Sequence, residues 1–439
     1  MTLTVPGLGP VPRLKRITAE ERVLDNGLVV LAVRRAGVPM VEIRLRVPFQ
    51  SAKRAHPAQA QLLADSILAG TAEHDREAVA ATVQGLGGTL SASADADRLL
   101  IGGSALTARL VPFLGLLGEV LTSATYPAGE VARDRARLIE RLTMARSQAG
   151  VVAHEALASR MWGDHPYALD LPQPGDVDAV TAAQVRRLHA DRVDPGDATL
   201  IVVGDISPGR AIDQVAAALA GWAADVRIRS TPMPPLPTIQ PGFPVLVDRP
   251  GSVQSALRLA GGAVERAHPD APALALANLI FGGYFSSRWV ENIREDKGYT
   301  YSPRSAVDHY VLGSIFTASA DVATEVTAPA LLETQYELGR IASLPVSAEE
   351  VDAVRQYAIG TLALSIATQS GLASSLSSLS GSGLGLAWLA GHPARMAAVT
   401  PEQVSAAATL YLAPARLVTV IVGDAAAISG PLAALTPLS

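Results

Sequence analysis

The alternation of apolar and polar residues along the first half of the chain predicts short strands mixed with longer helices. Two β-rich runs follow the turn signal Asp25-Asn26-Gly27. The expected strands span 27–33, 41–47, 89–93, 99–103 and 198–204, and the expected helices span 57–69, 76–86, 107–123 and 128–149. Because strands and helices do not alternate strictly, this pattern indicates an α+β fold in which sheets pack on helices.

The sequence repeats itself at about half its length. Val180-Thr-Ala-Ala-Gln-Val185 resembles Val399-Thr-Pro-Glu-Gln-Val404, at an offset of 219 residues. Two weaker echoes pair residues 63–70 with 276–283 and Glu130-Val131 with Glu350-Val351, at offsets of 213 and 220. Solenoid units run about 20–50 residues, so a repeat of this length indicates two similar domains that arose by duplication.

A proline-rich segment marks the boundary between the two repeats. Six prolines lie between Ser230 and Pro244. Proline favours extended backbone and lacks a backbone donor, so this segment is typical of a semi-rigid linker. We therefore expect an N-terminal domain at 1–228, a linker at 229–244 and a C-terminal domain at 245–439.

One long stretch, residues 356–394, carries no Asp, Glu, Lys or Arg. Its middle, from Ser370 to Leu384, holds seven Ser and three Gly. That composition does not fit a membrane span, which needs about 20 mainly apolar residues. We expect a low-charge helix and loop that either lines a chamber or forms a subunit contact. The first 13 residues lack a basic region followed by an apolar run, so we expect a cytoplasmic protein.

Composition excludes several classes of function. The chain has 439 residues, no cysteine and a formal net charge of −5. Disulfides, cysteine-ligated metals and thiol nucleophiles are therefore excluded. The absence of a basic stripe argues against nucleic acid as the main partner. The sequence contains no phosphate-binding loop, no dinucleotide fingerprint and no nucleophile elbow, and no two histidines are spaced i, i+4.

The most unusual segment is Gly282 to Ser302. Its two glycines, Gly282 and Gly283, allow the backbone to approach a ligand closely. A charged helix follows, with Gly298 as its expected C-cap, and an aromatic-rich strand is expected after it. Arg294 and Tyr301 are seven residues apart across this corner, so both could face one cavity. The alternative is a solvated helix followed by a core strand.

Taken together, these segments resemble the pitrilysin/insulinase family of zinc peptidases, in its two-domain bacterial branch that is similar to mitochondrial processing peptidase. The similarity is carried by Leu24-Asp-Asn-Gly27, by Ile67 to Thr71 followed by Gly87-Gly88, and by residues 283–302. The resemblance implies two homologous sheet-plus-helices domains that form half of a clamshell. It also implies a substrate and transition-state clamp at Arg294 and Tyr301, and a substrate-binding loop formed by Gly282, Gly283, Tyr284 and Phe285.

The chain departs from this family at its metal motif, H-x-x-E-H followed by a distal Glu. Registered on residues 69–71, the motif positions hold Gln61, Ala64 and Asp65. The distal Glu falls near Arg141, next to Glu140. Catalytic zinc needs three good protein ligands and an open position, and the motif Glu acts as the general base. These residues supply neither, so we expect no metal in this chain.

The sequence therefore predicts a zinc-free subunit of a heterodimeric processing metallopeptidase, inactive alone. A homologous zinc-binding subunit would supply the zinc and the general base, and the substrate would be an extended peptide, with no nucleic acid or membrane partner. The alternative is a non-catalytic scaffold or peptide-binding subunit of a larger complex. A third possibility is an active enzyme with an unorthodox metal site.

Overall fold

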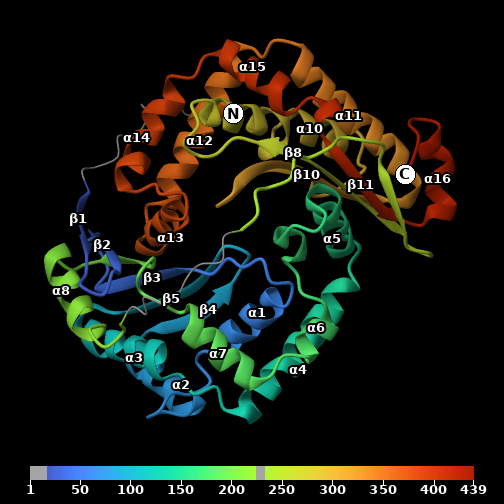
Figure 1. Cartoon of the computed structure of the whole chain (residues 1–439). Helices are drawn as coiled ribbons and strands as arrows, with labels where there is room; N and C mark the ends of the chain where they lie inside the picture. Colours follow the sequence, from blue (N-terminus) through green and yellow to red (C-terminus); the bar gives the residue numbers. More distant parts are fainter. Residues whose placement is uncertain (1–16, 224–232) are drawn as a thin grey trace, which may run out of the picture.

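Two sheets with the same strand order form the framework of the molecule (Figure 1). The computed structural model describes residues 17–223 and 233–439. The first sheet has the order β1-β2-β6-β3-β5-β4 and the second has the order β7-β11-β8-β10-β9. From β2 onward the orders correspond strand by strand. In the first sheet β6 lies parallel to β2 and antiparallel to β3, and in the second β11 lies parallel to β7 and antiparallel to β8. This correspondence supports duplication and confirms the predicted α+β fold.

The described strands and helices occur in similar order in the two halves. The strands are β1 (Thr18–Val23), β2 (Val29–Arg34), β3 (Met40–Pro48), β4 (Thr89–Ala94), β5 (Arg98–Leu106), β6 (Thr199–Gly204), β7 (Val245–Asp248), β8 (Gln254–Ala263), β9 (Arg304–Tyr310), β10 (Gly313–Ala323) and β11 (Val418–Gly423). The helices of the first half are α1 (His56–Ser66), α2 (Arg76–Gly85), α3 (Leu110–Ser123), α4 (Ala128–Arg146), α5 (Ala149–Trp162), α6 (Pro174–Asp178), α7 (Ala182–Arg192) and α8 (Pro208–Ala218). Those of the second half are α9 (Ala271–Asn278), α10 (Arg288–Val290), α11 (Thr327–Ser343), α12 (Ala348–Ser365), α13 (Gln369–Ser380), α14 (Leu386–Ala397), α15 (Pro401–Tyr411) and α16 (Ala425–Ala433).

The repeated V-T-x-x-Q-V motif is a helix start. In α7 the hydroxyl of Thr181 accepts a hydrogen bond from the backbone N–H of Gln184, whose side chain reaches back to the N-cap backbone. Thr400 and Gln403 form the same capping box at α15. Each box satisfies backbone donors that the first helical turn leaves without partners. The repeat is therefore visible in sequence because both copies keep the same local hydrogen bonds.

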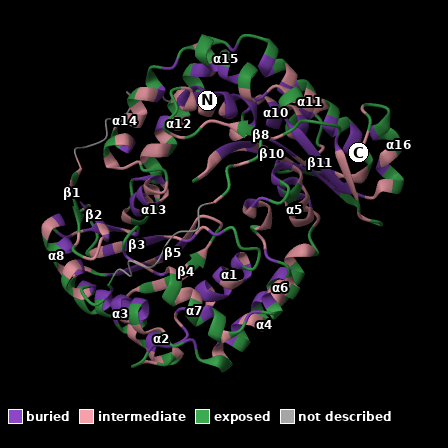
Figure 2. Cartoon of the chain, in the orientation of Figure 1, coloured by how far each residue is buried: buried purple, intermediate pink, exposed green. Residues whose placement is uncertain are grey.

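The strands β6 and β11 are buried along nearly their whole length. Their sequences are continuous apolar runs because both faces of each sheet are covered, as expected for central strands. One face of the first sheet packs on a core that includes helices α1, α3, α4, α7 and α8, and the second sheet has a matching core. Figure 2 shows the buried residues concentrated on the sheets and on the inner sides of the helices.

The remaining face of each sheet is covered by a helix from the other half. Leu372, Leu376 and Leu379 of α13 pack against apolar residues of β2 and β6 in the first sheet. Ala153, Leu157 and Met161 of α5 pack against strands β8, β10 and β11 of the second sheet. Because α5 begins at residue 149 and α13 at residue 369, the two helices are counterparts in the repeat. The halves are therefore joined by a reciprocal exchange of covering helices, visible in Figure 1 as α13 beside β2 and β3 and as α5 beside β11.

The uncharged stretch 356–394 thus forms part of the contact between the halves of one chain. Its serines face arginines on the polar side of β3: Arg44 donates to Ser370 at 2.9 Å and to Ser374 at 3.4 Å. Ser370 and Ser374 are four residues apart on α13 and therefore lie on one helix face. The serine-rich composition supplies hydroxyl acceptors to a cationic strand face.

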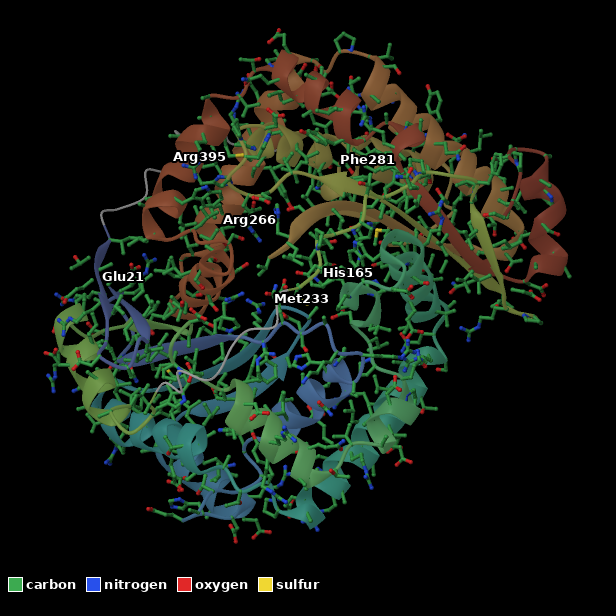
Figure 3. The ribbon with its side chains drawn as sticks, viewed as in Figure 1. Glu21, His165, Met233, Arg266, Phe281 and Arg395 are labelled. Atoms are coloured by element: carbon green, nitrogen blue, oxygen red, sulfur yellow. The ribbon has the colours of Figure 1, made fainter. Side chains whose placement is uncertain are left out.

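The described part of the expected linker contacts both halves, and Leu236 packs in the cluster that α5 forms with the second sheet. His165 Nε2 is 3.0 Å from the carbonyl oxygen of Pro234, and Arg160 donates to the carbonyl of Gln240 at 2.8 Å. Figure 3 shows His165 and Met233 close together between the halves. The expected linker residues 229–232 and the first 16 residues of the chain lie outside the described residues. Within the described residues, no helix is long and apolar enough to cross a membrane.

Two expected elements differ from the structure. The aromatic segment 299–302 is not a strand, because the ladder of β9 begins at Arg304, directly after Pro303. Proline cannot donate to a ladder, so pairing starts behind it. The expected helix at 128–149 ends at Arg146, and a second helix begins at Ala149. The strand β1 was not expected, because most of its residues are polar or exposed.

Candidate functional site

The positions that correspond to zinc ligands by resemblance hold an ion pair. Arg141 of α4 donates from Nη2 to Oδ2 of Asp65 on α1 at 2.8 Å. Burial raises the pKa of Asp65 above its usual value, while the hydrogen bond from Arg141 opposes that shift. By the resemblance, position 141 would supply the third metal ligand, and Arg141 brings a positive charge there instead.

Gln61 lies one helical turn before Asp65 and lines a small pocket of about 20 Å³ with Ala94 and Asp95. Of the registered positions, Gln61 offers an amide, Asp65 a carboxylate bound to Arg141, and Ala64 no polar group. Among the described residues, three ligand atoms of His, Asp or Glu come close together only at Glu73, His74 and Glu119. Zinc requires at least three nitrogen, sulfur or carboxylate ligands. The residues present do not fit a catalytic zinc ion.

A second group of potential ligands lies away from these positions. Glu73, His74 and Glu119 bring one ligand atom each to within 4.8 Å of one another. His74 Nδ1 is 2.9 Å from Glu119 Oε1, and the hydroxyl of Thr71 also donates to this carboxylate. The hydrogen bond that the His74 ring donates to the Glu119 carboxylate raises the pKa of His74. These contacts join the turn after α1 to α3. The His74–Glu119 ion pair therefore explains why the three residues lie close together.

In the second half, the two consecutive glycines are required by packing. A Cβ atom on Gly282 would lie 2.8 Å from the ring of Trp289 and 2.9 Å from Ser305 Oγ. A Cβ atom on Gly283 would lie 2.6 Å from Asn278 Nδ2. Both glycines lie in the π-helical turn Leu279–Gly283, and the Phe281 ring stacks on Trp289 with centroids 5.2 Å apart. The glycines thus allow this turn to lie against the core of the second half.

Arg294 and Tyr301 lie together at the surface, with Phe285. The guanidinium carbon of Arg294 is 5.1 Å from the centroid of the Tyr301 ring and 4.4 Å from that of Phe285. Gly298, with φ +66°, ends the helical segment, and the backbone N–H of Tyr299 bonds to the carbonyl of Ile293 at 2.8 Å. This C-cap turns the chain so that Tyr301 returns over Arg294.

Both rings of this group are exposed to solvent. Tyr301 is 83% exposed and Phe285 is 60% exposed. The Tyr301 hydroxyl makes no hydrogen bond to any residue in the described part of the chain. The other aromatic residue of the expected loop, Tyr284, packs on Tyr357 with ring centroids 4.9 Å apart. The surface therefore presents a cation between two rings and a free phenol.

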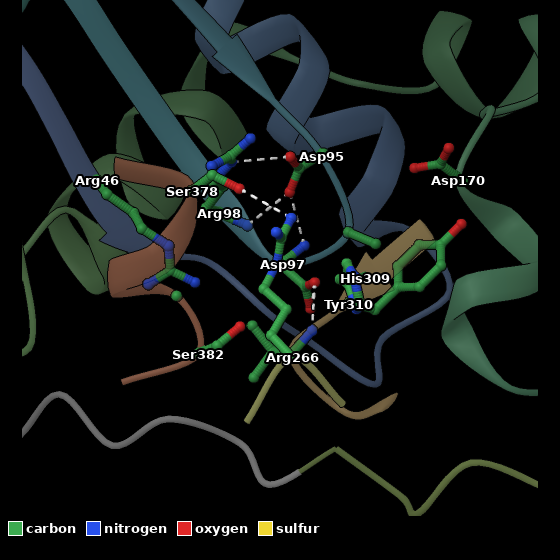
Figure 4. Close-up of a pocket in the computed structure, with 13 residues that line it drawn as sticks. Arg46, Asp95, Asp97, Arg98, Asp170, Arg266, His309, Tyr310, Ser378 and Ser382 are labelled. Carbon is green, nitrogen blue, oxygen red and sulfur yellow. Dashed lines mark hydrogen bonds and ion pairs between the residues drawn. The ribbon is translucent and has the colours of Figure 1, made fainter. Parts of the chain in front are cut away.

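A cavity of about 170 Å³ lies between the two halves (Figure 4). Its charged lining residues are Arg46, Asp95, Asp97, Arg98 and Asp170 from the first half and Arg266 from the second. Ser378 and Ser382, at the end of α13, also line it, as do His309 and Tyr310 of β9. Sequence reasoning missed this site because its residues meet only when the halves dock. The one sequence signal is Glu42, Arg44 and Arg46, which alternate with apolar residues on β3 and suggest a solvent-facing side.

The sequence of this chain is similar to a peptidase family model and to several bacterial proteins. A family model described as the peptidase M16 inactive domain matches residues 179–357. An uncharacterized zinc protease of Streptomyces coelicolor is 24% identical over 361 residues, which cover 77% of this chain and 75% of the relative. The uncharacterized zinc protease YmxG of Bacillus subtilis is 21% identical over 68% of this chain and 71% of its own length.

Solved structures share the fold over nearly the whole chain. The peptidase M16 inactive domain from Pseudomonas fluorescens superposes with a TM-score of 0.86 at 24% identity, covering 93% of this chain and 98% of that one. A protease from Helicobacter pylori gives a TM-score of 0.86 at 17% identity, covering 93% of this chain and all of that one. The periplasmic protease PqqL from Escherichia coli gives 0.77 at 17% identity, and the chain spans 48% of its length. The predicted resemblance is thus confirmed: residues 179–357 match the peptidase M16 inactive domain, and the chain shares the fold of these M16 structures.

Proposed function

We propose that this chain is the zinc-free subunit of a heterodimeric processing metallopeptidase. In this assembly a homologous subunit would hold zinc and the general base, and this chain would contribute Arg294 and Tyr301. The observation that carries the proposal is the contrast between its two halves. The positions registered on the metal motif by resemblance hold the Asp65–Arg141 ion pair. The surface of the second half presents a phenol that bonds to no described residue and lies against a guanidinium.

The chemistry of the pair suits a peptide substrate. A phenol can donate a hydrogen bond to the oxyanion that forms when water attacks a scissile carbonyl, and losing one such donor costs about 10²–10³ in kcat. The guanidinium lies over the face of the Tyr301 ring and so orients the phenol, and it can also donate a hydrogen bond to a substrate carbonyl. Neither group activates water, so this role requires the partner's metal.

The position of Tyr301 also suits an extended peptide. The tyrosine lies three residues before β9, and β9 forms one edge of the second sheet. A peptide that paired with this edge would add a strand by backbone hydrogen bonds, a common mode of peptide recognition. Its backbone would then run toward the phenol.

The PqqL comparison supports the idea of a larger enclosure. That chain is about twice as long as this one, so it has room for a second unit of similar size. In the proposed heterodimer, two separate chains would supply these units. We further propose the cytoplasm as the site of action and an N-terminal unit, a linker and a C-terminal unit at 1–228, 229–244 and 245–439.

The test is peptide cleavage by a complex of this chain with a homologue that carries H-x-x-E-H, encoded by a neighbouring gene. We expect no cleavage by this chain alone. Tyr301→Phe should lower kcat about 10²-fold with little change in KM, and Arg294→Ala should lower kcat/KM, both with normal assembly. The matched control is Tyr336→Phe, because Tyr336 is also exposed, at 58%.

The alternative function, a scaffold or peptide-binding subunit, is favoured by one feature of the site. Arg294 already has partners within this chain, because it stacks on two rings and lies 3.0 Å from Glu295 Oε1. An exposed group of this kind is also typical of protein interfaces, which are enriched in aromatic residues and Arg. If Tyr301→Phe and Arg294→Ala left turnover unchanged but weakened assembly, the scaffold role would replace the catalytic one.

A further inference from the structure

The cavity between the halves contains a buried cation that no described residue pairs with. Arg46 is only 7% exposed, and its side chain makes no hydrogen bond or ion pair with any described residue. Its Nε atom is fully buried. Burial, followed by repulsion from Arg98, lowers the pKa of Arg46. Burying an unpaired charge is strongly unfavourable, and buried charges in proteins are therefore normally paired.

The neighbouring arginine on the same strand face is fully paired. Arg44 forms an ion pair with Glu42 at 2.9 Å and donates to Ser370 and Ser374 of α13. Arg46 lies two residues further along β3 and therefore on the same face. At this point α13 ends, and Gly381 brings bare backbone against the guanidinium. A Cβ atom on Gly381 would lie 3.0 Å from Nε and Nη2 of Arg46. Among the described residues Arg46 has no hydrogen-bond partner, because Ser370 and Ser374 lie against Arg44 and the backbone of Gly381 lies against Arg46.

The acidic residues near Arg46 are engaged elsewhere. Asp95 accepts from Arg98 Nε at 3.0 Å. Asp97 accepts from the Tyr167 hydroxyl at 2.5 Å, from Gln50 at 2.7 Å and from the backbone N–H of Val311 at 2.9 Å. Neither carboxylate hydrogen-bonds Arg46, although the negative charges of Asp97 and Asp95 partly offset the effect of burial on its pKa.

A second guanidinium reaches the cavity from the other half. Arg266 makes one long hydrogen bond, 3.4 Å to Ser378 Oγ. His309 lies nearby on β9, and its pKa is lowered to about 4 by burial and by Arg266, so this ring is neutral at pH 7. Asp170 makes no hydrogen bond within the described chain. Figure 4 shows Asp170 on the far side of the pocket from Arg46, with Arg266 between them.

We propose that this cavity binds an α-carboxylate, either of a free amino acid or of a short peptide's C-terminal residue, held by Arg46 and Arg266. The planar guanidinium fork matches a carboxylate with two parallel hydrogen bonds. A cavity of about 150 Å³ can hold a benzene molecule, so the 170 Å³ here suits one small residue. Three aspartates in the lining disfavour a dianion such as phosphate, and Asp170 can receive the ammonium of a free amino acid. The site is separate from Arg294 and Tyr301, which do not line it.

The proposal is tested with the purified full chain by thermal unfolding and calorimetric titration at constant ionic strength. The probes are L-alanine, trialanine, trialanine amide and inorganic phosphate. We expect saturable binding and a rise in Tm with alanine or with trialanine, and no such effect with trialanine amide or phosphate. Binding of alanine alone identifies a free amino acid as the ligand, and binding of trialanine identifies a peptide end.

Variants then assign the effect to Arg46. Arg46→Met should weaken carboxylate binding at least tenfold, whereas Arg44→Met should retain it even though the variant loses its own ion pair. Gly381→Ala should also weaken binding, because its methyl group would displace the Arg46 guanidinium. This variant replaces Arg46→Met as the test if Arg46→Met does not fold. Equal binding by wild type and by both cavity variants, absence of carboxylate binding in the wild type, or a preference for phosphate or the amide would each overturn the proposal. These readouts need no partner subunit, so they fail independently of the proposed peptidase role.

Discussion

Truncation of Leu376 on α13 should loosen the contact that joins the two halves. Leu376 is 1% exposed and packs between the helix and the first sheet. Leu→Ala removes the equivalent of about three methylene groups, each worth about 0.8 kcal/mol on burial, or about 2.4 kcal/mol. The hole left behind adds to this, because the strands beneath are fixed by their ladders. Measured Leu→Ala costs in cores begin at about 2.7 kcal/mol, so we expect about 3 kcal/mol.

Because the chain has two sheets and two cores, its global unfolding need not be two-state, and local opening is the better measurement. Amide hydrogen exchange resolves α13, β2 and β6 separately. A loss of 3 kcal/mol corresponds to exchange faster by about 10²-fold at amides that α13 protects, because 1.4 kcal/mol is about tenfold. The control is Leu364→Ala on the preceding helix, where the side chain is 74% exposed.

The reciprocal contact gives an internal check on this reasoning. Leu157 of α5 is 4% exposed and packs on the second sheet, so Leu157→Ala should accelerate exchange in β8 and β11 by a similar factor. If Leu376→Ala changed exchange no more than Leu364→Ala did, α13 would not be holding the halves together. The view of two halves locked by exchanged helices would then be wrong.

Two further predictions concern the metal positions and one ion pair. We expect the triple variant Gln61→His/Asp65→His/Arg141→Glu to bind about one zinc per chain, measured by elemental analysis. The double variant that retains Arg141 should bind none, because the guanidinium lies beside position 65, 2.8 Å from the Asp65 carboxylate. Absence of zinc from the triple variant would refute the registration. Two hydrogen bonds from Arg288, at 2.7 and 2.9 Å, lower the pKa of Glu350 from 4.5 to about 2. The ionised Glu350 therefore stabilises the fold above pH 4.5, and this stabilisation is lost as the pH falls toward 2. Glu350→Gln should flatten the pH dependence of Tm in this window, whereas the exposed neighbour variant Glu349→Gln should leave it unchanged; equal slopes in all three proteins would contradict this.

Sequence alone predicted the elements whose signals are local. The repeated V-T-x-x-Q-V motif corresponds to capping boxes at α7 and α15, so its meaning did not depend on distant residues. The apolar run at 198–204 predicted the strand β6 for the same reason. The strand expected at 299–302 was wrong because aromatic composition outweighed the effect of Pro303. The registration of Gln61, Ala64, Asp65 and Arg141 on a metal motif stays a prediction, although the last two residues are in contact.

The cavity could not be predicted, because its chemistry depends on which face of β3 is covered. Alternation in β3 places Glu42, Arg44 and Arg46 on one side, and an isolated domain would leave that side in water. Docking of α13 turns this polar side into an interface. The same serine-rich helix that looked unusual in sequence is explained once Arg44 and Arg266 are seen to donate to its hydroxyls.

This arrangement makes the cavity a property of the docked molecule and not of either half. Arg46 comes from the first half, whereas Arg266 and His309 come from the second, so a carboxylate held by both guanidinium groups binds only when the halves are together. A ligand that binds only the docked state stabilises it by mass action. The carboxylate should therefore slow the opening that Leu376→Ala accelerates, at α13 amides and in proportion to ligand saturation. If a saturating carboxylate left α13 exchange unchanged in Leu376→Ala, the ligand would not be bound between the halves.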